Sequence, residues 1–511
     1  MAISNPGGNL NSVAAPTKQT LSTNYLDLAS GSTDWAQQYV PDLMEKEAEV
    51  FGNRTISGFL SQVGAEEAMT ADQVVWSEQG RLHLSYIGNI KSATAQAVNG
   101  TEPGGVIEID TDIDGNSTST SAIDHGIRVN DILLVASSAY TAVCLVTGAT
   151  ADDIDVAPYN ATASGGRLTD IGFSATDTVT VLVVGSEYGK GRSYTATDLT
   201  TGNTYEASSS RQSNEPQFKS FSNKPIIIKD YYSVSGSDAS RIGWVEISQE
   251  DGTSGYLWYL KAESETRMRF TDHLEMSMLE SIKVTNANSE ADNYLGGTDT
   301  AASGSWCTQG LFDAISDRGN ITTGIVGLPT DLAEFDAILA EFDNQGAIEE
   351  NMLFANRATS LAVDDMLASM NSYGAGGTSY GVFDNSEDMA LNLGFSGFRR
   401  GSYDFYKSDF RYLNDKATRG GINSRDTVNA VRGVIVPAGT SSVYDQQLGK
   451  NMKRPFLHVR YRASATDNRR LKTWVTGSVG ATTSALDAME IHMLSERCLI
   501  TQGANNFMLL K

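Results

Sequence analysis

The chain has 511 residues and a formal net charge of −24, which argues against a surface that binds nucleic acids without sequence preference. No apolar run reaches the roughly 18 residues that a membrane-spanning helix needs, and three widely separated cysteines argue against a disulfide framework. The length predicts about three domains. The N-terminus shows no secretory signal, which together with the cysteines leads us to expect a reducing cytosol.

The N-terminal part of the chain changes from irregular to regular sequence. Residues 1–30 are rich in Ser, Thr, Asn and Gly, which is typical of an irregular arm. Within residues 33–62, Pro41 and Asp42 precede LMEKEAEVF and predict a helix. Two strand-like runs, QVVWS and RLHLSYI, follow within Gln73–Ile87 and predict a β-hairpin with one apolar face.

Residues 100–225 differ from the sequence on either side. Short β-branched runs alternate with turns of Gly, Asn and Asp at a spacing of roughly ten residues. This pattern predicts a small all-β barrel or sandwich. Between Gly100 and Lys190 the cations are Arg128, Arg167 and Lys190, against many acids. The acidity and the β pattern together indicate a separate module.

A long helix is predicted over Tyr256–Val284, where neither Gly nor Pro occurs. At about 1.5 Å per residue it would span roughly 40 Å, and such a charged helix must lie across a sheet or a neighbouring subunit. Two i,i+4 acid–base pairs support it, Glu263–Arg267 and Glu265–Arg269. Its apolar stripe recurs every four residues, at Phe270, Leu274, Met278 and Ile282.

The last 200 residues mix helices and strands. Asp331 and Glu334 resemble a capping box before the stripe Leu332, Phe335, Leu339 and Phe342, and Arg357–Met370 is predicted as a second helix. Val431–Pro437 reads as a buried strand. The end alternates through Met489, Ile491 and Met493 and then has a strand–turn–strand pattern. We therefore expect the C-terminus to close a sheet that begins earlier in the chain.

Basic residues outnumber acidic ones between Arg399 and Lys472. These cations either form an ordinary solvated surface or attract an acidic surface, which would belong to the same copy of the chain or to another copy. On the second interpretation, reversing Arg460, Arg462, Arg469 and Arg470 together would stop association and leave the subunit folded. The residues proposed for a subunit interface are Trp76, Arg81, Glu263, Arg267, Arg269, Arg460, Arg462, Arg469 and Arg470.

Three short motifs suggest chemistry but have simpler explanations. Gly377–Gly381 matches the G-x-S-x-G of a serine nucleophile, yet the strand and helix that this motif needs are missing, and we prefer a glycine-rich loop. Gly185–Gly191 has the wrong spacing for a phosphate loop. Asp110, Asp112 and Asp114 match the first half of a calcium loop, but position 12 is Ser121, so a solvated acidic turn is preferred. We expect no cofactor and no catalytic residue.

The order of the elements and the amino-acid sequences of four segments resemble those of a known protein family. The segments are PDLMEKEAEVFGNRTISGFLSQVGAEEAM, VVWSEQGRLHLSY, ESETRMRFTDHLEMSML and LDAMEIHMLSERCLITQGANNF. They are similar to major capsid proteins of tailed double-stranded DNA bacteriophages, which have the Hong Kong 97-type fold, and most of all to those of crAss-like and related marine phages. The resemblance covers most of the chain outside residues 100–225.

The resemblance implies an α+β fold divided as 1–50 N-terminal arm, 51–99 first part of an extended β-hairpin loop, 100–225 inserted β-rich domain, 226–299 return of that loop and peripheral domain with a spine helix, 300–485 axial domain and 486–511 C-terminal strands of the peripheral domain. It further implies a non-enzymatic virion protein, assembled in the host cytoplasm as hexamers and pentamers. The shell would enclose double-stranded DNA without binding specific sequences, and it would contain no membrane. Its partners would be portal, auxiliary or decoration proteins. The alternative is a glycan-binding or hydrolytic protein that carries a β module.

Overall fold

The protein is described here by a computed structural model in which the chain forms two compact units. The smaller is one continuous stretch, Ser77–Ser220, and the larger combines chain before and after it. The expected N-terminal arm and the helix after Pro41 lie outside the described residues. The structure describes residues 58–60, 65–79, 85–97, 102–112, 125–150, 152–161, 165–188, 218–239, 246–248, 254–283, 308–323, 332–346, 348–371, 397–426, 429–438, 440–445, 450–479 and 483–511.

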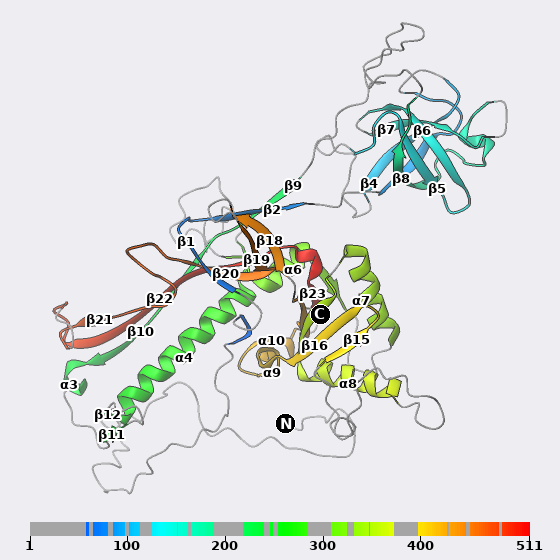
Figure 1. Ribbon diagram of the computed structural model, residues 1–511. Helices are drawn as coiled ribbons and strands as arrows, with labels where there is room; N and C mark the ends of the chain where they lie inside the picture. The colour runs from blue at the N-terminus through cyan, green and yellow to red at the C-terminus, as the bar shows by residue number, and fades with distance from the viewer. Residues whose placement is uncertain are drawn as a thin grey trace. The chain divides into compact units, whose positions relative to one another are not determined.

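The smaller unit is a closed six-stranded barrel (Figure 1). Every paired strand is antiparallel to its neighbour, in the order β3-β4-β7-β6-β5-β8 with β8 returning to β3. Side chains alternate between inside and outside, so that Leu133, Cys144 and Val181 are fully buried. The strands are β3 (Ser85–Ser92), β4 (Gly105–Asp112), β5 (Asp131–Ala136), β6 (Thr141–Ala149), β7 (Asp153–Pro158) and β8 (Thr178–Ser186).

The predicted hairpin over Gln73–Ile87 is wrong. β2 (Val74–Gln79) pairs with β9 (Phe218–Asn223), and β3 pairs with β4 and β8 inside the barrel. The alternating pattern predicted a strand correctly, but a strand in a closed barrel takes both of its partners from far along the sequence. β3 also lies before residue 100, where the β-rich segment was expected to begin.

The larger unit contains a five-stranded sheet that joins distant parts of the chain. The order is β1-β20-β22-β10, with β21 paired to the first half of β22. β1 and β20 are parallel, and the other pairs are antiparallel. The strands are β1 (Ala65–Met69), β10 (Ile226–Ser235), β20 (Leu457–Arg462), β21 (Lys472–Gly477) and β22 (Ala488–Thr501).

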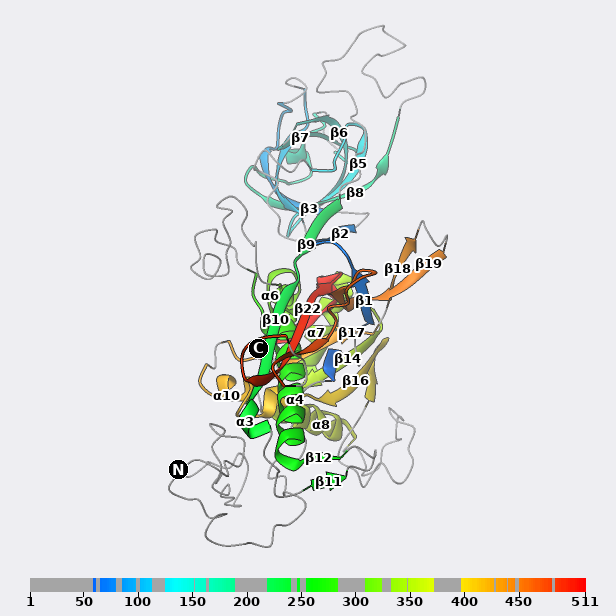
Figure 2. The ribbon, with the colours of Figure 1, turned by 90° about the vertical axis from the view of Figure 1, so that its left-hand side faces the viewer.

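The predicted long helix is confirmed as α4 (Leu257–Glu280), 24 residues long. It lies alongside β10 and β22 in both views (Figures 1 and 2). Phe270 and Leu274 of its stripe are buried together with Met493 of β22, which satisfies the expectation that the helix lies across a sheet. Ile282, expected to extend the stripe, is 67% exposed because the helix ends two residues before it.

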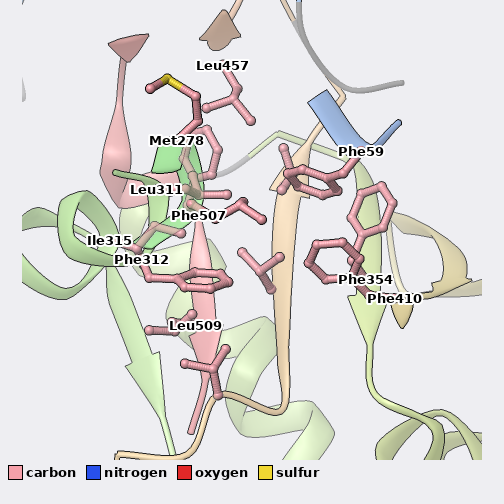
Figure 3. Close-up of a cluster of buried hydrophobic side chains, with 14 of the residues drawn as sticks. Phe59, Met278, Leu311, Phe312, Ile315, Phe354, Phe410, Leu457, Phe507 and Leu509 are labelled. Atoms are coloured by element: carbon pink, nitrogen blue, oxygen red, sulfur yellow. The ribbon is translucent and has the colours of Figure 1, made fainter. Parts of the chain in front are cut away.

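A second, six-stranded sheet lies between two apolar clusters, in the order β13-β23-β17-β14-β16-β15. Leu509 faces one cluster (Figure 3), and Val434 belongs to the same cluster. Ile435 and Leu510 face the other cluster, next to α7 (Leu332–Gln345). Burial on both faces explains the unbroken apolar run of β17, which the sequence predicted. The strands are β13 (Asn320–Thr322), β14 (Glu350–Ala355), β15 (Gly397–Arg400), β16 (Tyr403–Asp409), β17 (Gly433–Pro437) and β23 (Met508–Leu510).

The end of the chain connects the two sheets. β22 belongs to the five-stranded sheet and β23 to the six-stranded sheet, and Gly503 turns between them in the left-handed conformation (φ 60°). The expectation that the C-terminus closes an earlier sheet is confirmed for β23, which lies between β13 and β17. The predicted helix at Arg357–Met370 is confirmed as α8 (Arg357–Asn371), whereas Asp331 of the expected capping box lies outside the described residues.

The remaining described elements are short. They are η1 (Leu168–Asp170), α3 (Gly236–Ala239), β11 (Glu246–Ser248), β12 (Ser254–Tyr256), α6 (Leu311–Arg318), α9 (Arg411–Asn414), α10 (Arg419–Asn423), β18 (Thr440–Asp445), β19 (Lys450–Pro455) and η3 (Ala504–Asn506). No helix in the described part of the chain is both long enough and apolar enough to cross a membrane.

Candidate interaction surface

The predicted interface cations of the basic stretch gather where β1, β20 and β22 of the five-stranded sheet lie side by side. Arg460 of β20 lies opposite Glu67 in the parallel register with β1, and its Nη2 is 3.2 Å from Glu67 Oε2. Parallel neighbours point to the same face of a sheet, so the pairing of β1 with β20 is what brings these two charges together.

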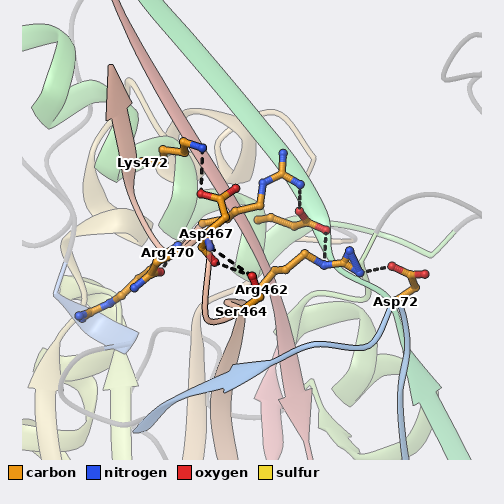
Figure 4. Close-up of polar contacts among 9 residues, drawn as sticks. Asp72, Arg462, Ser464, Asp467, Arg470 and Lys472 are labelled. Atoms are coloured by element: carbon orange, nitrogen blue, oxygen red, sulfur yellow. Dashed lines mark hydrogen bonds and ion pairs between the residues drawn. The ribbon is translucent and has the colours of Figure 1, made fainter. Parts of the chain in front are cut away.

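Glu496 of β22 is the centre of a larger network, which includes the pair of Arg462 and Asp72 seen in Figure 4. Its carboxylate is only 5% exposed; Oε1 lies 3.3 Å from Arg462 Nε, and Oε2 pairs with Arg469. Arg462 also pairs with Asp72, which follows β1. A nearly buried carboxylate between two guanidiniums is charge-compensated where it lies, so this network holds β1, β20 and β22 together.

Glu66 of β1 also pairs with two arginines, Arg470 and Arg497. Arg470 pairs with Glu66 and lies over the ring of Tyr461, 5.8 Å from the ring centroid. Arg497 Nη1 is 3.8 Å from Glu66 Oε1, and burial lowers the pKa of the Arg497 guanidinium from its usual value.

The loop between β20 and β21 is held by its own charges. Lys472 Nζ lies 2.8 Å from Asp467 Oδ1 (Figure 4), and this hydrogen bond lowers the pKa of the Asp467 carboxyl. The Arg469 amide donates to the Arg462 carbonyl over 2.9 Å, which returns the loop to the strand it left. Arg460, Arg462, Arg469 and Arg470 therefore all have acidic partners in their own subunit, and reversing them would break these pairs as well as any contact between copies.

The other predicted interface residues also have partners within the chain. Glu263 and Arg267 form the expected i,i+4 pair at 3.2 Å. Arg269 reaches Asp230 of β10 at 3.4 Å, which joins α4 to the sheet. Trp76 is 9% exposed and lies under the guanidinium of Arg318, and Arg81 lies outside the described residues.

A hollow that sequence reasoning missed lies beside the end of α4. It has a volume of about 530 Å³ and is lined by Met276, Tyr412, Lys416, Ala417, Thr418, Arg419, Gly421, Ile422, Arg425 and Asp426. Glu280 holds two of these lining residues by accepting hydrogen bonds from Tyr412 Oη (2.9 Å) and from Arg419 Nη1 (2.7 Å). Lys416 and Arg425 were two members of a long basic stretch, and no local sequence signal separates them from the rest.

The motifs that suggested chemistry gain no support in the described residues. Asp110 and Asp112 lie in strand β4, and the Asp110 carboxylate accepts from Asn89 Nδ2 over 2.5 Å. Asp114, Gly377–Gly381 and Lys190 lie outside the described residues. Among the side chains that are described, no group of three or more His, Cys, Asp or Glu is placed to hold a metal ion.

Cys144 and Cys498 are both buried and free. Burial raises the pKa of each thiol to about 12, which keeps the reactive thiolate form scarce at neutral pH. These two cysteines therefore behave as small apolar core residues.

No family model matches the chain, and no curated protein matches it. Among solved structures, the chain is similar to one from Microbacterium phage Oxtober96 at 8% identity, covering 95% of this chain and 99% of that one, with a TM-score of 0.35.

Two further structures are similar at the same level. A chain of the capsid of a native GTA particle has 9% identity, coverage of 95% and 99%, and a TM-score of 0.34. A chain of the Cyanophage Pam1 capsid asymmetric unit has 10% identity, coverage of 63% and 82%, and a TM-score of 0.30. All three scores lie below 0.5, so these similarities do not establish a shared fold.

Proposed function

We propose that the chain is a major capsid protein of a tailed bacteriophage, with the Hong Kong 97-type fold. The observation that carries the proposal is the order of its elements. β10 leads towards the long helix α4, α4 packs on β10 and β22, a second sheet follows, and the last strands return to both sheets. The resemblance of the four sequence segments quoted above to capsid proteins implies the same order of elements.

Each part then has a place in the shell subunit. α4 is the spine helix, and the five-stranded sheet beneath it belongs to the peripheral domain. The six-stranded sheet with α7 and α8 is the axial domain. The paired strands β2 and β9 belong to the extended loop, and the barrel of β3 to β8 is a domain inserted in that loop.

The electrostatics suit a container for nucleic acid. A chain with a net charge of −24 is repelled by packaged double-stranded DNA rather than bound to it. The shell would assemble from hexamers and pentamers in the host cytoplasm and become part of the virion, with portal, auxiliary or decoration proteins as partners. Closed symmetry allows every copy to satisfy the same contacts.

Assembly of the purified chain tests the proposal. The chain would be produced in bacteria, alone and together with its head partners, and analysed by sedimentation and electron microscopy. We expect large closed particles of uniform size. A chain that stays monomeric at high concentration in the presence of those partners would contradict the proposal, as would hydrolytic activity that is lost on Ser379→Ala.

A further inference from the structure

Most cations of the basic stretch of residues 399–472 whose side chains the structure describes are neutralised within the chain. Besides the pairs described above, its cations pair with nearby carboxylates: Arg399 with Asp404, Arg400 with Asp336, Lys407 with Asp364, Arg411 with Asp415 and Arg419 with Glu280. Arg432 donates to the Thr323 carbonyl. Among the cations of this stretch whose side chains are described, Lys416 and Arg425 alone have neither an ion pair nor a side-chain hydrogen bond.

These two cations share one site. Both line the hollow beside α4, and both are exposed. Between them in sequence lies Ile422, which is 55% exposed although it is a large aliphatic residue. The hollow therefore offers two cations without an ion pair, with one carboxylate (Asp426) and apolar surface beside them, and mixed surface of this kind is found at protein interfaces.

The hollow is also held in a fixed shape. Arg419 is bound by Glu280 and by the Asn429 carbonyl (3.0 Å), and Thr418 Oγ1 donates to the Tyr412 carbonyl over 2.6 Å. A site whose walls are already ordered loses less entropy when a partner binds.

We propose that this hollow binds an acidic surface of a second copy of the chain, with carboxylates against Lys416 and Arg425 and an apolar side chain against Ile422. The inference deepens the proposed function and rests on it. A second copy is favoured by charge complementarity, because the chain carries 62 acidic residues against 38 basic ones. The described part of the barrel has Lys91, Arg128 and Arg167 as its cations, and a longer series of acids that are not buried: Glu102, Glu108, Asp110, Asp112, Asp152, Asp153, Asp170, Asp177 and Glu187.

The competing ligand is the phosphate of double-stranded DNA, which two cations could also bind. The apolar lining argues against it, since Met276 and Ile422 offer nothing to a phosphate. A protein surface with both carboxylates and apolar side chains uses the whole hollow.

The main test compares full-length charge variants in assembly. Lys416→Glu/Arg425→Glu reverses both charges, and Lys416→Gln/Arg425→Gln removes them with little change in shape. The control, Lys224→Glu/Lys229→Glu, makes the same charge change at two lysines, one just before β10 and one on it, that belong to none of the ion pairs described above. Circular dichroism and urea unfolding establish that each variant is folded, and light scattering at low salt follows particle formation.

We expect particles to form at least about tenfold more slowly in the reversed variant than in the control, with the Gln variant between them and with all differences shrinking as salt rises. Equal rates in the reversed variant and the control would overturn the proposal. If the reversed variant fails to fold, the Gln variant decides: slower assembly supports the proposal, and wild-type assembly overturns it. Failure of the wild-type chain itself to form particles would instead refute the proposed function.

A direct measurement identifies the partner. Particles assembled from equal amounts of normal and ¹⁵N-labelled chains would be treated with a carbodiimide, which joins a lysine amine to a nearby carboxylate. Mass spectrometry should find Lys416 linked to an Asp or Glu peptide of the other isotope. Links confined to one copy would overturn the proposal, as would a DNA duplex that binds the wild-type chain and is released by the charge reversal without any effect on assembly.

Discussion

Glu275 of α4 accepts a hydrogen bond from the backbone amide of Gly58 over 2.7 Å, although 217 positions separate the two residues in sequence. The same carboxylate accepts from the Leu60 amide at 3.0 Å. Phe59 lies between these two amides and enters the core, where it stacks on Phe410 at 4.9 Å and meets Phe354 edge-on at 4.6 Å (Figure 3). This contact fixes residues 58–60 to the C-terminal part of the long helix.

Replacing Glu275 should change how stability depends on pH. Burial raises the pKa of Glu275 above 4.5, more than the backbone amides lower it. The folded state therefore holds this proton more tightly than the unfolded state, and the free energy of unfolding falls as pH rises from about 4.5 through the raised pKa. Glu275→Gln should lose this fall. Urea unfolding between pH 4 and 8 measures it, and parallel curves for the two proteins would contradict the prediction.

Removing Phe59 should be costly. Its ring is 4% exposed, and Phe59→Ala should lower the free energy of unfolding by about 3 kcal/mol through lost burial and the cavity left behind. Leu361→Ala on α8 is the control, since Leu361 is 51% exposed and its loss should cost less than about 0.5 kcal/mol. Similar losses for both would mean that Phe59 does not belong to the core.

The network around Glu496 should contribute to the stability of the subunit. Glu496→Ala leaves Arg469 without its carboxylate and Arg462 with Asp72 alone, and should cost about 2 kcal/mol, less than a fully buried pair because both arginines are partly exposed. Glu263→Ala breaks the exposed pair with Arg267 and should cost less than about 0.5 kcal/mol. The two variants would be compared by urea unfolding, and equal effects would refute a structural role for the network.

The barrel should fold only when β3 is present. A fragment of residues 77–220 contains all six strands and should unfold cooperatively with a β-type circular dichroism spectrum. A fragment of residues 100–225 lacks β3, which leaves one edge of both β4 and β8 unpaired, and should be unfolded or much less stable. Two fragments of equal stability would mean that β3 does not close the barrel.

Local periodicity predicted individual elements well. The helix α4, the buried strand β17 and the alternating strand β22 follow from the spacing of apolar residues within each segment. Partners were harder to predict. The hairpin over Gln73–Ile87 failed because two neighbouring strand patterns do not reveal that each pairs with a strand elsewhere in the chain.

The same limit applied to charge. The sequence shows a surplus of cations between Arg399 and Lys472, but the carboxylates that neutralise Arg462 and Arg470 lie in β22, in β1 and just after β1. Only the pairing of β1, β20 and β22 brings them together. Lys416 and Arg425 could be distinguished from the other cations only after those pairs were known.

The pairing of β1 with β20 and of β10 with β22 affects how the chain folds as it is made. β1 (residues 65–69) and β10 (226–235) leave the ribosome long before their partners at 457–462 and 488–501, whereas every barrel strand lies within residues 85–186. The barrel can therefore form early, while the apolar stripe of α4 waits for Met493 to cover it. During that interval nascent chains expose the same surface to one another, so the larger unit depends on slow, long-range closure and on protection from premature contact between copies.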